Sequence, residues 1–517
     1  MSHRFLLLAC GLAFLPCAAM AQSAGNFSQA AQSPLRYTLA PAHPRLDCRA
    51  VASLGGGAVT ITSTEEVPAS EANPPFCRVK GVIAPEIQFE VDLPANWNRR
   101  FYMFGNGGYA GENLELPARR ELSAAALRAG FLTAQQNTGH DASREPLGAF
   151  GSNLQKTMDY AFRAVHETAV EAKRLGAAYY GRDVTYSYWD SCSTGGRQGL
   201  MSVQRFPEDF DGVIAGAPVR NFVDTMVNYV WNAQALDGAG LTLAKMKTVA
   251  EAAYGRCAGK DGLIDDPRKC DFSPARDVKA CPPAQDGEDC LTPNEAKAID
   301  QIYAGITLAD GGRMFFGWPK GAEVADGWGY WIIDPESKLS RQTQYMLTFM
   351  RNLAFGHAEP DFDFHKFDFV KDPPRMSAIR SLLNPDDTDL SAFRRRGGKL
   401  IMYHGWADTA LTPFMSVDYY ERAVAANGSD TPDFFRLYMI PGMAHCRGGI
   451  ATDRFDGISS IVNWTEAGIA PDRIEAARMH NGKVDRTRPL CPYPQVATYS
   501  GSGGMDESAN FTCKLAQ

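Results

Sequence analysis

The sequence predicts an α/β fold whose mostly parallel sheet is interrupted by one large insertion. From Gly81 onwards, short apolar runs of the length of a buried strand alternate with segments of helical periodicity. The alternation stops at about residue 221 and resumes at Lys399. Residues 221–396 are instead rich in Asp, Pro, Gly and aromatic side chains. We therefore assign them to a lid domain inserted into a core that consists of residues 22–220 and 397–517.

The elements of the core follow in chain order. Residues 101–104 form an apolar run that ends at a glycine, as a buried strand would. Met158, Phe162, Val165 and Ala169 recur at the spacing of one helix face. The predicted strands are residues 101–104, 131–134, 184–189, 212–215, 400–403 and 435–440. The predicted helices are residues 158–175, residues 199–203 and a segment that begins at about residue 458.

The composition is that of a globular chain, and its 517 residues exceed the length of one ordinary domain. The net charge of −7 argues against nucleic-acid binding and against a polybasic membrane anchor. Beyond the N-terminal apolar run, no stretch is long enough to span a bilayer. We therefore expect neither nucleic acid nor a membrane as a partner.

Residues 1–21 have the pattern of a signal peptide. Arg4 supplies a short positive region, residues 5–17 form an apolar run, and Ala19-Met20-Ala21 is a small-x-small cleavage site. A lipoprotein signal is the alternative, but it would place the lipidated Cys10 too early, with half of the apolar run behind it. We expect a secreted or periplasmic protein.

Ten of the twelve cysteines lie beyond the predicted signal peptide. An even number in an exported chain indicates a disulfide framework, and ten buried thiols are the less favourable alternative in an oxidising compartment. No Cys-x-x-Cys pair is present, which argues against a zinc site. The ten are Cys48, Cys77, Cys192, Cys257, Cys270, Cys281, Cys290, Cys446, Cys491 and Cys513.

Ser193 lies between a predicted strand and a predicted helix, in Tyr-Trp-Asp-Ser-Cys-Ser-Thr-Gly-Gly-Arg-Gln-Gly. This is the context of a nucleophile elbow, where a sharp turn holds a serine hydroxyl above the sheet. Gly195 matches the second glycine of the G-x-S-x-G pattern, whereas Ser191 replaces the first. An ordinary Gly-rich turn between strand and helix is the alternative.

Asp408 and His445 each lie in a loop that follows a predicted strand. In an α/β-hydrolase, the acid that orients the histidine and the histidine that acts as general base occupy such loops. Taken singly, Asp408 fits a helix N-cap equally well, and His445 fits a surface histidine. The order Ser193, Asp408, His445 is the α/β-hydrolase order, so the three together predict a catalytic triad on that fold.

The triad has two corollaries. Cys192 and Cys446 adjoin the serine and the histidine, so an assembled triad makes them neighbours and allows a disulfide; a free, nucleophilic Cys192 is the alternative. An oxyanion hole requires two backbone N–H donors. We assign these to Thr194 and to Gly108 (or Gly107), with a simple hairpin or bulge as the alternative for the Gly-rich segment.

The Cys-Ser-Thr-Gly-Gly-Arg-Gln-Gly, His-Gly-x-x-Asp and Gly-Met-x-His-Cys segments together resemble the tannase and feruloyl esterase family. The resemblance extends from about Cys48 to Cys513. It implies an α/β-hydrolase core with a lid inserted before the acid, and it implies that His404 lines the substrate pocket. It also implies a Cys192–Cys446 disulfide and supports nearest-neighbour pairing of the others as Cys48–Cys77, Cys257–Cys270, Cys281–Cys290 and Cys491–Cys513.

Relatives in this family carry a calcium loop in the lid, and the corresponding loop here lies between Cys257 and Cys270. It is shorter and lacks the first acid. Calcium takes about six to eight oxygen ligands. Asp261, Asp265 and the carbonyl of Leu263 can supply some of them, and a disulfide-closed turn without metal is the alternative.

The resemblance and the triad predict an exported carboxylic ester hydrolase that forms an acyl-enzyme and uses no organic cofactor. The expected substrates are small esters of hydroxybenzoic, hydroxycinnamic or terephthalic acids. We expect the lid to select the acyl group through some of its aromatic or arginine side chains. The alternatives are an inactive binding protein of the same fold and a general esterase, lipase or peptidase. The lid side chains are Trp318, Trp328, Trp331, Phe349, Phe355, Arg341 and Arg351.

Overall fold

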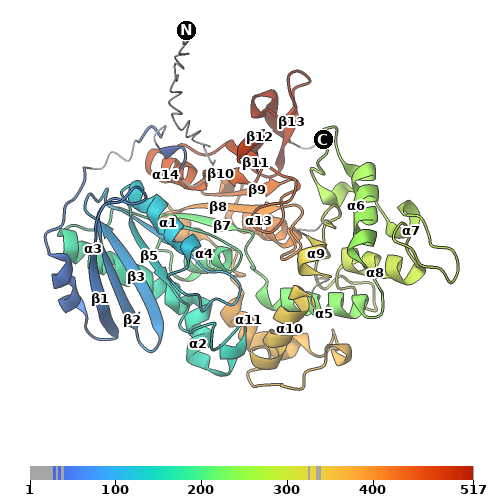
Figure 1. Cartoon of the computed structure of the whole chain (residues 1–517), viewed down its shortest axis with the longest axis horizontal. Helices are drawn as coiled ribbons and strands as arrows, with labels where there is room; N and C mark the ends of the chain where they lie inside the picture. The colour runs from blue at the N-terminus through green and yellow to red at the C-terminus, as the bar shows by residue number, and fades with distance from the viewer. Residues whose placement is uncertain (1–26, 31–32, 36–39, 324–326, 334–338, 516–517) are drawn as a thin grey trace, which may run out of the picture.

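The computed structural model (Figure 1) describes residues 27–30, 33–35, 40–323, 327–333 and 339–515. The predicted signal peptide, residues 1–21, lies outside these ranges. Within them, no helix has the length and apolar character that crossing a bilayer requires.

Nine of the described strands form one mixed sheet. Each neighbouring pair in the series β4, β6, β7, β8 and β9 is parallel, whereas the pairs β1–β2, β2–β3 and β3–β5 at the other edge of the sheet are antiparallel. The predicted strands correspond to β4 through β9, while β1, β2 and β3 were not predicted. In side-by-side order the strands are β1 (Val59–Val67), β2 (Phe76–Ile83), β3 (Ile87–Pro94), β5 (Leu132–Gln136), β4 (Arg100–Phe104), β6 (Tyr186–Cys192), β7 (Gly212–Gly216), β8 (Lys399–Gly405) and β9 (Phe435–Ile440).

Helices cover both faces of this sheet, which explains why central strands such as β4 and β7 are largely apolar on both faces. In β4, the side chains of Phe101 and Met103 lie on one face of the sheet and those of Tyr102 and Phe104 lie on the other, as the alternation along a strand requires. The first face is covered by α3 (Ala164–Tyr180), α4 (Thr194–Arg205) and α13 (Phe414–Asn427). The second face is covered by α1 (Pro117–Arg128) and α14 (Gly457–Ala467). A short helix α2 (Leu154–Met158) and one π-helical turn (Asp159–Arg163) lead into α3.

The lid lies between β7 and β8 and is helical. Although β7 and β8 are adjacent parallel strands, the chain forms eight α-helices and three short 3-10 helices between them among the described residues, and these supply most of one hydrophobic cluster. Figure 1 shows α5 to α10 gathered at one side of the molecule, away from β1, β2 and β3. The helices are α5 (Phe222–Leu236), α6 (Leu243–Cys257), α7 (Pro274–Asp277), α8 (Pro293–Ala304), α9 (Trp328–Trp331), α10 (Arg341–Asn352), α11 (Ser377–Leu383) and α12 (Ser391–Arg395).

A β-rich extension ends the chain. The strands β10 (Arg454–Phe455), β11 (Ile474–His480) and β12 (Lys483–Leu490) form a small antiparallel sheet. The strands β13 (Gln495–Tyr499) and β14 (Phe511–Leu515) form a separate hairpin. None of these strands was predicted from the sequence.

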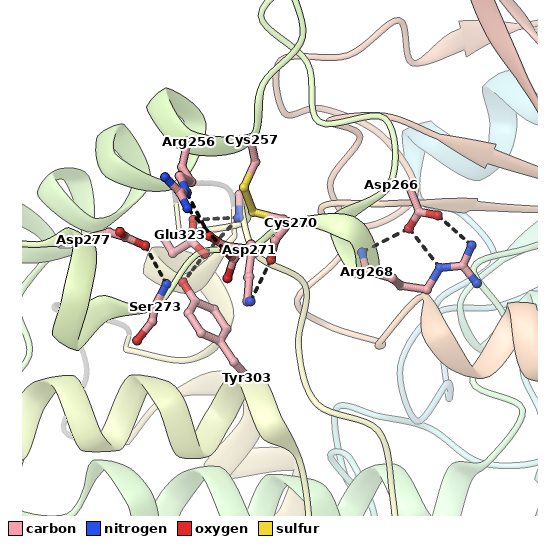
Figure 2. Close-up of a disulfide and its surroundings, with 12 residues drawn as sticks. Arg256, Cys257, Asp266, Arg268, Cys270, Asp271, Ser273, Asp277, Tyr303 and Glu323 are labelled. Atoms are coloured by element: carbon pink, nitrogen blue, oxygen red, sulfur yellow. Dashed lines mark hydrogen bonds and ion pairs between the residues drawn. A yellow bond between two sulfur atoms is a disulfide. The ribbon is translucent and has the colours of Figure 1, made fainter. Parts of the chain in front are cut away.

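All ten cysteines beyond the predicted signal peptide are paired in the structure. The pairs are Cys48–Cys77, Cys192–Cys446, Cys257–Cys270, Cys281–Cys290 and Cys491–Cys513. Figure 2 shows the Cys257–Cys270 bond, with the Asp266–Arg268 ion pair beyond it on the same loop. The bond therefore closes the lid loop for which calcium was considered.

Candidate active site

Ser193 occupies a strained turn between β6 and α4. Its φ of 65° and ψ of −123° lie in a region that non-glycine residues rarely adopt. The glycines that follow are required by crowding, because a Cβ on Gly195 would lie 1.9 Å from the Ser191 Oγ and one on Gly196 would lie 2.2 Å from the Gly216 carbonyl. Ser191 itself is part of β6, where extended backbone tolerates a side chain. The turn has the geometry of a nucleophile elbow.

Asp408 and His445 form a hydrogen-bonded pair. The Nδ1 atom of His445 lies 2.8 Å from the Asp408 Oδ2, so Nδ1 carries the proton and the Nε2 lone pair is free to act as a base. The other oxygen of Asp408 accepts the N–H groups of Ala410 at 2.8 Å and Leu411 at 2.9 Å. Asp408 is thereby fixed in one orientation.

The charge of Asp408 is favoured despite its complete burial. Burial alone would raise the pKa of the carboxyl, but the neighbouring His445 and His404 hold it below its ordinary value. A permanently ionised, immobile carboxylate is what stabilises an imidazolium during proton transfer.

His404 does not have the predicted position in the substrate pocket. It is completely buried behind Asp408, and the cavity wall does not include it. Its Nε2 lies 3.1 Å from the Asp408 Oδ2 and 3.0 Å from the Leu411 carbonyl, and both atoms are acceptors, so Nε2 is protonated. Its Nδ1 lies 2.8 Å from the Ser416 Oγ. His404 therefore orients the acid instead of contacting substrate.

The Cys192–Cys446 disulfide links the nucleophile turn to the histidine turn. The two Cα atoms are 5.9 Å apart, and the bonded residues directly adjoin Ser193 and His445. Ser193 and His445 both line one cavity of about 840 Å³. The triad residues that the sequence predicted are thus brought together at one site.

The Gly-rich segment before α1 provides the candidate oxyanion donor. Gly107 donates its N–H to Glu112 at 3.0 Å, which favours Gly108 over Gly107 as the donor. The carbonyl of Gly108 accepts from the hydroxyls of Tyr160, at 3.0 Å, and Thr194. Thr194 is the first residue of α4, where backbone N–H groups lack an intrahelical partner. Gly108 and Thr194 line the cavity together.

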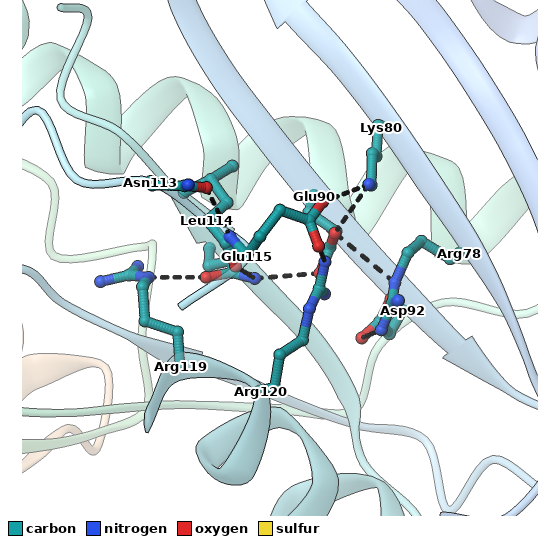
Figure 3. A network of polar contacts seen from close by, with 10 residues as sticks. Arg78, Lys80, Glu90, Asp92, Asn113, Leu114, Glu115, Arg119 and Arg120 are labelled. Carbon is teal, nitrogen blue, oxygen red and sulfur yellow. Dashed lines mark hydrogen bonds and ion pairs between the residues drawn. The ribbon is translucent and has the colours of Figure 1, made fainter. Parts of the chain in front are cut away.

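A network of polar side chains holds the Gly-rich segment in place. Glu112 also accepts from the Asn106 side chain at 3.1 Å and pairs with Arg119, whose Nε donates to Gln135 at 2.7 Å. Gln135 in turn donates to the buried carboxylate of Glu90 at 2.9 Å. Figure 3 shows Glu90 at the centre of its ion pairs with Arg78, Lys80 and Arg120. Donors held in this way need little reorganisation when charge develops on substrate.

The lid supplies an aromatic wall to the cavity. Of the five lid aromatics predicted, only Trp331 lines it, and the Trp331 ring lies edge-to-face with His445 at 5.4 Å between ring centroids. Trp318, Trp328 and Phe349 are instead buried in the lid's own cluster. The lid contributes further lining side chains that the sequence did not predict: Phe222, Met226, Tyr229 and Tyr345.

The remaining lid candidates lie outside the cavity wall. Arg341 stacks on Tyr330 at 3.9 Å from the ring centroid, and Arg375 lies over the ring of Phe355 at 4.3 Å. Arg351 is exposed. The cavity lining also includes the polar residues Asp190, Tyr403, Arg447, Asp453 and Arg454.

The residues predicted for calcium do not fit that ion. Asp261 and Asp265 both pair with Arg488, and the Leu263 carbonyl accepts the Gly259 N–H at 2.8 Å. Within the described ranges, no group of three or more His, Cys, Asp or Glu side chains could hold a metal. The oxygen atoms of this loop are therefore already paired with donor groups of the protein itself.

Known proteins are similar to this chain over most of their length. The model of the family described as "Tannase and feruloyl esterase" matches residues 71–514. The mono(2-hydroxyethyl) terephthalate hydrolase of Piscinibacter sakaiensis is 34% identical over 515 residues, covering 86% of this chain and 85% of the relative. The feruloyl esterase B of Aspergillus niger is 30% identical over 473 residues, covering 86% and 87%.

Solved structures agree with the fold. The feruloyl esterase B of Aspergillus oryzae superposes with a TM-score of 0.78 at 27% identity, covering 90% of this chain and all of its own. The tannin acyl hydrolase of Aspergillus niger superposes with a TM-score of 0.70 at 19% identity, covering 94% and 95%. These likenesses confirm the predicted α/β-hydrolase fold.

Proposed function

Because the chain belongs to the tannase and feruloyl esterase family and is one of its carboxylic ester hydrolases, we propose that it cleaves esters of aromatic acids at Ser193. The acids are of the hydroxybenzoic, hydroxycinnamic or terephthalic type. Two relatives carry names that specify aromatic esters, feruloyl esterase B and mono(2-hydroxyethyl) terephthalate hydrolase. The presence of all three triad residues argues against an inactive binding protein, because such proteins typically lose one of them.

The proposed reaction uses the three triad residues in the roles of a serine hydrolase. His445 Nε2 removes the proton of the Ser193 hydroxyl as its oxygen attacks the ester carbonyl, and the Asp408 carboxylate stabilises the resulting imidazolium. The N–H groups of Gly108 and Thr194 bind the oxyanion. His445 returns the proton to the leaving alcohol, and an acyl-enzyme forms. Water then attacks the acyl carbon by the same route, without an organic cofactor.

One observation carries the choice of an aromatic acyl group: the triad cavity is walled on the lid side by aromatic rings. Trp331 lies against His445, and Tyr345 lies 6.1 Å from Trp331 and 5.2 Å from Tyr109 between ring centroids. A ring of the substrate placed beside them would gain about 0.5–1.5 kcal/mol beyond its burial.

The experiment compares wild type with Trp331→Ala on methyl esters of aromatic acids and on p-nitrophenyl acetate. We expect kcat/KM for the aromatic esters to fall by about two- to tenfold more than for the acetate, which is the stacking energy expressed as a rate ratio. Phe355→Ala is the matched control, because this lid aromatic lies outside the cavity wall. Equal proportional losses on both ester types would contradict the proposal.

We also propose that the enzyme is exported. Five disulfides favour an oxidising compartment, and the signal peptide at residues 1–21 remains a prediction from the sequence. N-terminal sequencing of the mature protein tests it, and a chain that retains residues 1–21 would contradict it.

A further inference from the structure

An arginine from the C-terminal extension reaches into the disulfide-closed loop of the lid. Arg488, on β12, forms an ion pair with Asp261, and its Nη2 lies 3.0 Å from the Asp265 Oδ1. The Arg488 side chain is only 4% exposed and that of Asp261 only 10%. Two carboxylates from a loop between Cys257 and Cys270 thus share one guanidinium that lies more than two hundred residues further along the chain.

Burial lowers the pKa of the Arg488 guanidinium to about 10, which leaves it charged at neutral pH, and two further groups lie beside it. Its guanidinium carbon lies 4.7 Å from the centroid of the Phe511 ring, and Nη2 lies 3.4 Å from the Ala497 carbonyl. A guanidinium buried this deeply would be strongly destabilising without the two carboxylates. The carboxylates, equally, would repel each other without a cation between them.

The loop that Arg488 holds contacts the turn that carries His445. Leu263 is buried, and a Cβ built on Gly442 would lie 3.2 Å from the Leu263 Cδ2. The same Cβ would lie 2.8 Å from the Ile450 Cγ1. The loop, Gly442 and Ile450 are therefore in close contact, and Gly442 precedes the catalytic histidine by only three residues.

We propose that Arg488 does in this protein what a bound divalent cation would otherwise do: it closes the Cys257–Cys270 loop and positions the His445 turn. Arginine suits this role because it stays protonated and its planar fork can pair with two carboxylates at once. It joins the lid to the C-terminal extension by an internal charge instead of a metal ion. Arg488 is a positioning residue, since it does not line the active-site cavity.

The test starts with the thermal stability of the full secreted chain. Wild-type Tm is expected to stay within about 1 °C in EDTA and in millimolar CaCl2. Arg488→Ala is expected to lower Tm by roughly 5–10 °C, because it leaves the largely buried carboxylate of Asp261 and the half-exposed carboxylate of Asp265 without their partner. Adding Asp261→Asn and Asp265→Asn to that variant is expected to restore at least half of the loss.

The control is Arg486→Ala on the same strand, whose partner Asp506 is 57% exposed, and it should change Tm by no more than about 1 °C. A wild-type Tm that rises with calcium or falls with EDTA would overturn the proposal. So would a triple variant that is no more stable than Arg488→Ala. If Arg488→Ala cannot be recovered folded, recovery of a folded triple variant supports the proposal, and failure of both overturns it.

A second readout separates positioning from stability. At a temperature where all variants are folded, Arg488→Ala should lower kcat on a p-nitrophenyl ester by about tenfold, with KM within about twofold, because a displaced His445 impairs chemistry more than binding. The triple variant should recover kcat. An unchanged kcat would contradict the positioning role. This readout rests on the proposed function, whereas the Tm readout does not, so the failure of one is distinguishable from the failure of the other.

Discussion

The Cys192–Cys446 bond should stabilise the protein more than a short-range disulfide does. It joins residues 254 positions apart, and the chain-entropy relation for a loop of that length gives about 5.5 kcal/mol at 25 °C as an upper figure. The same relation gives only about 2.5 kcal/mol for Cys281–Cys290, which spans 9 positions. The long bond also directly adjoins Ser193 and His445, so its loss should separate the base from the nucleophile.

The assay compares Cys192→Ala/Cys446→Ala with Cys281→Ala/Cys290→Ala. Urea unfolding is expected to show the larger loss of unfolding free energy in the first variant. Turnover of a p-nitrophenyl ester under native conditions is expected to fall sharply in the first variant and to stay near wild type in the second. The reasoning is refuted if the first variant is no less stable than the second and turns over ester at the wild-type rate.

Three further predictions concern carboxyl groups. Asp408→Asn should lower kcat by about 10⁴-fold in steady-state kinetics, since the amide cannot stabilise the imidazolium; a loss below tenfold would contradict the triad. Glu112→Gln should lower kcat by about tenfold with KM nearly unchanged, because it loosens the segment that carries Gly108. Glu115→Gln is the control. Equal effects of the two substitutions on kcat would exclude a role of Glu112 in positioning Gly108. Burial raises the pKa of Glu323 above its ordinary 4.5, so the folded chain binds the carboxyl proton more tightly than the unfolded chain does. The free energy of unfolding therefore falls as the pH rises through the raised pKa. Tm measured against pH should show that decline in wild type and less of it in Glu323→Gln, and identical slopes would disprove it.

The central strands and the triad were predictable because their signals are local. Strands such as β7 are buried on both faces and therefore read as continuous apolar runs. Ser193, Asp408 and His445 each follow a strand of this sheet, and the carboxyl ends of parallel strands meet at one edge. By contrast, β1 and most of β12 are half-exposed and rich in polar residues, which leaves no clear periodicity.

The functions of other residues depend on contacts that no local pattern encodes. Tyr345 and Phe349 lie one turn apart on α10, yet only Tyr345 reaches the cavity, because the packing of the lid decides which face of the helix is covered. His404 lies at the carboxyl end of β8, as a pocket residue would, but it contacts Ser416 and Asp408 and is completely buried. Arg488 meets Asp261 only because the C-terminal extension folds back onto the lid.

The central claim is that Ser193 is the nucleophile of an ester hydrolase, and Ser193→Ala tests it most directly. The variant should keep the wild-type Tm and circular dichroism spectrum while its p-nitrophenyl ester turnover falls to no more than about 10³–10⁴-fold above the reaction in water, the remainder that oxyanion donors and binding supply. A folded Ser193→Ala protein with near-wild-type turnover would contradict the account.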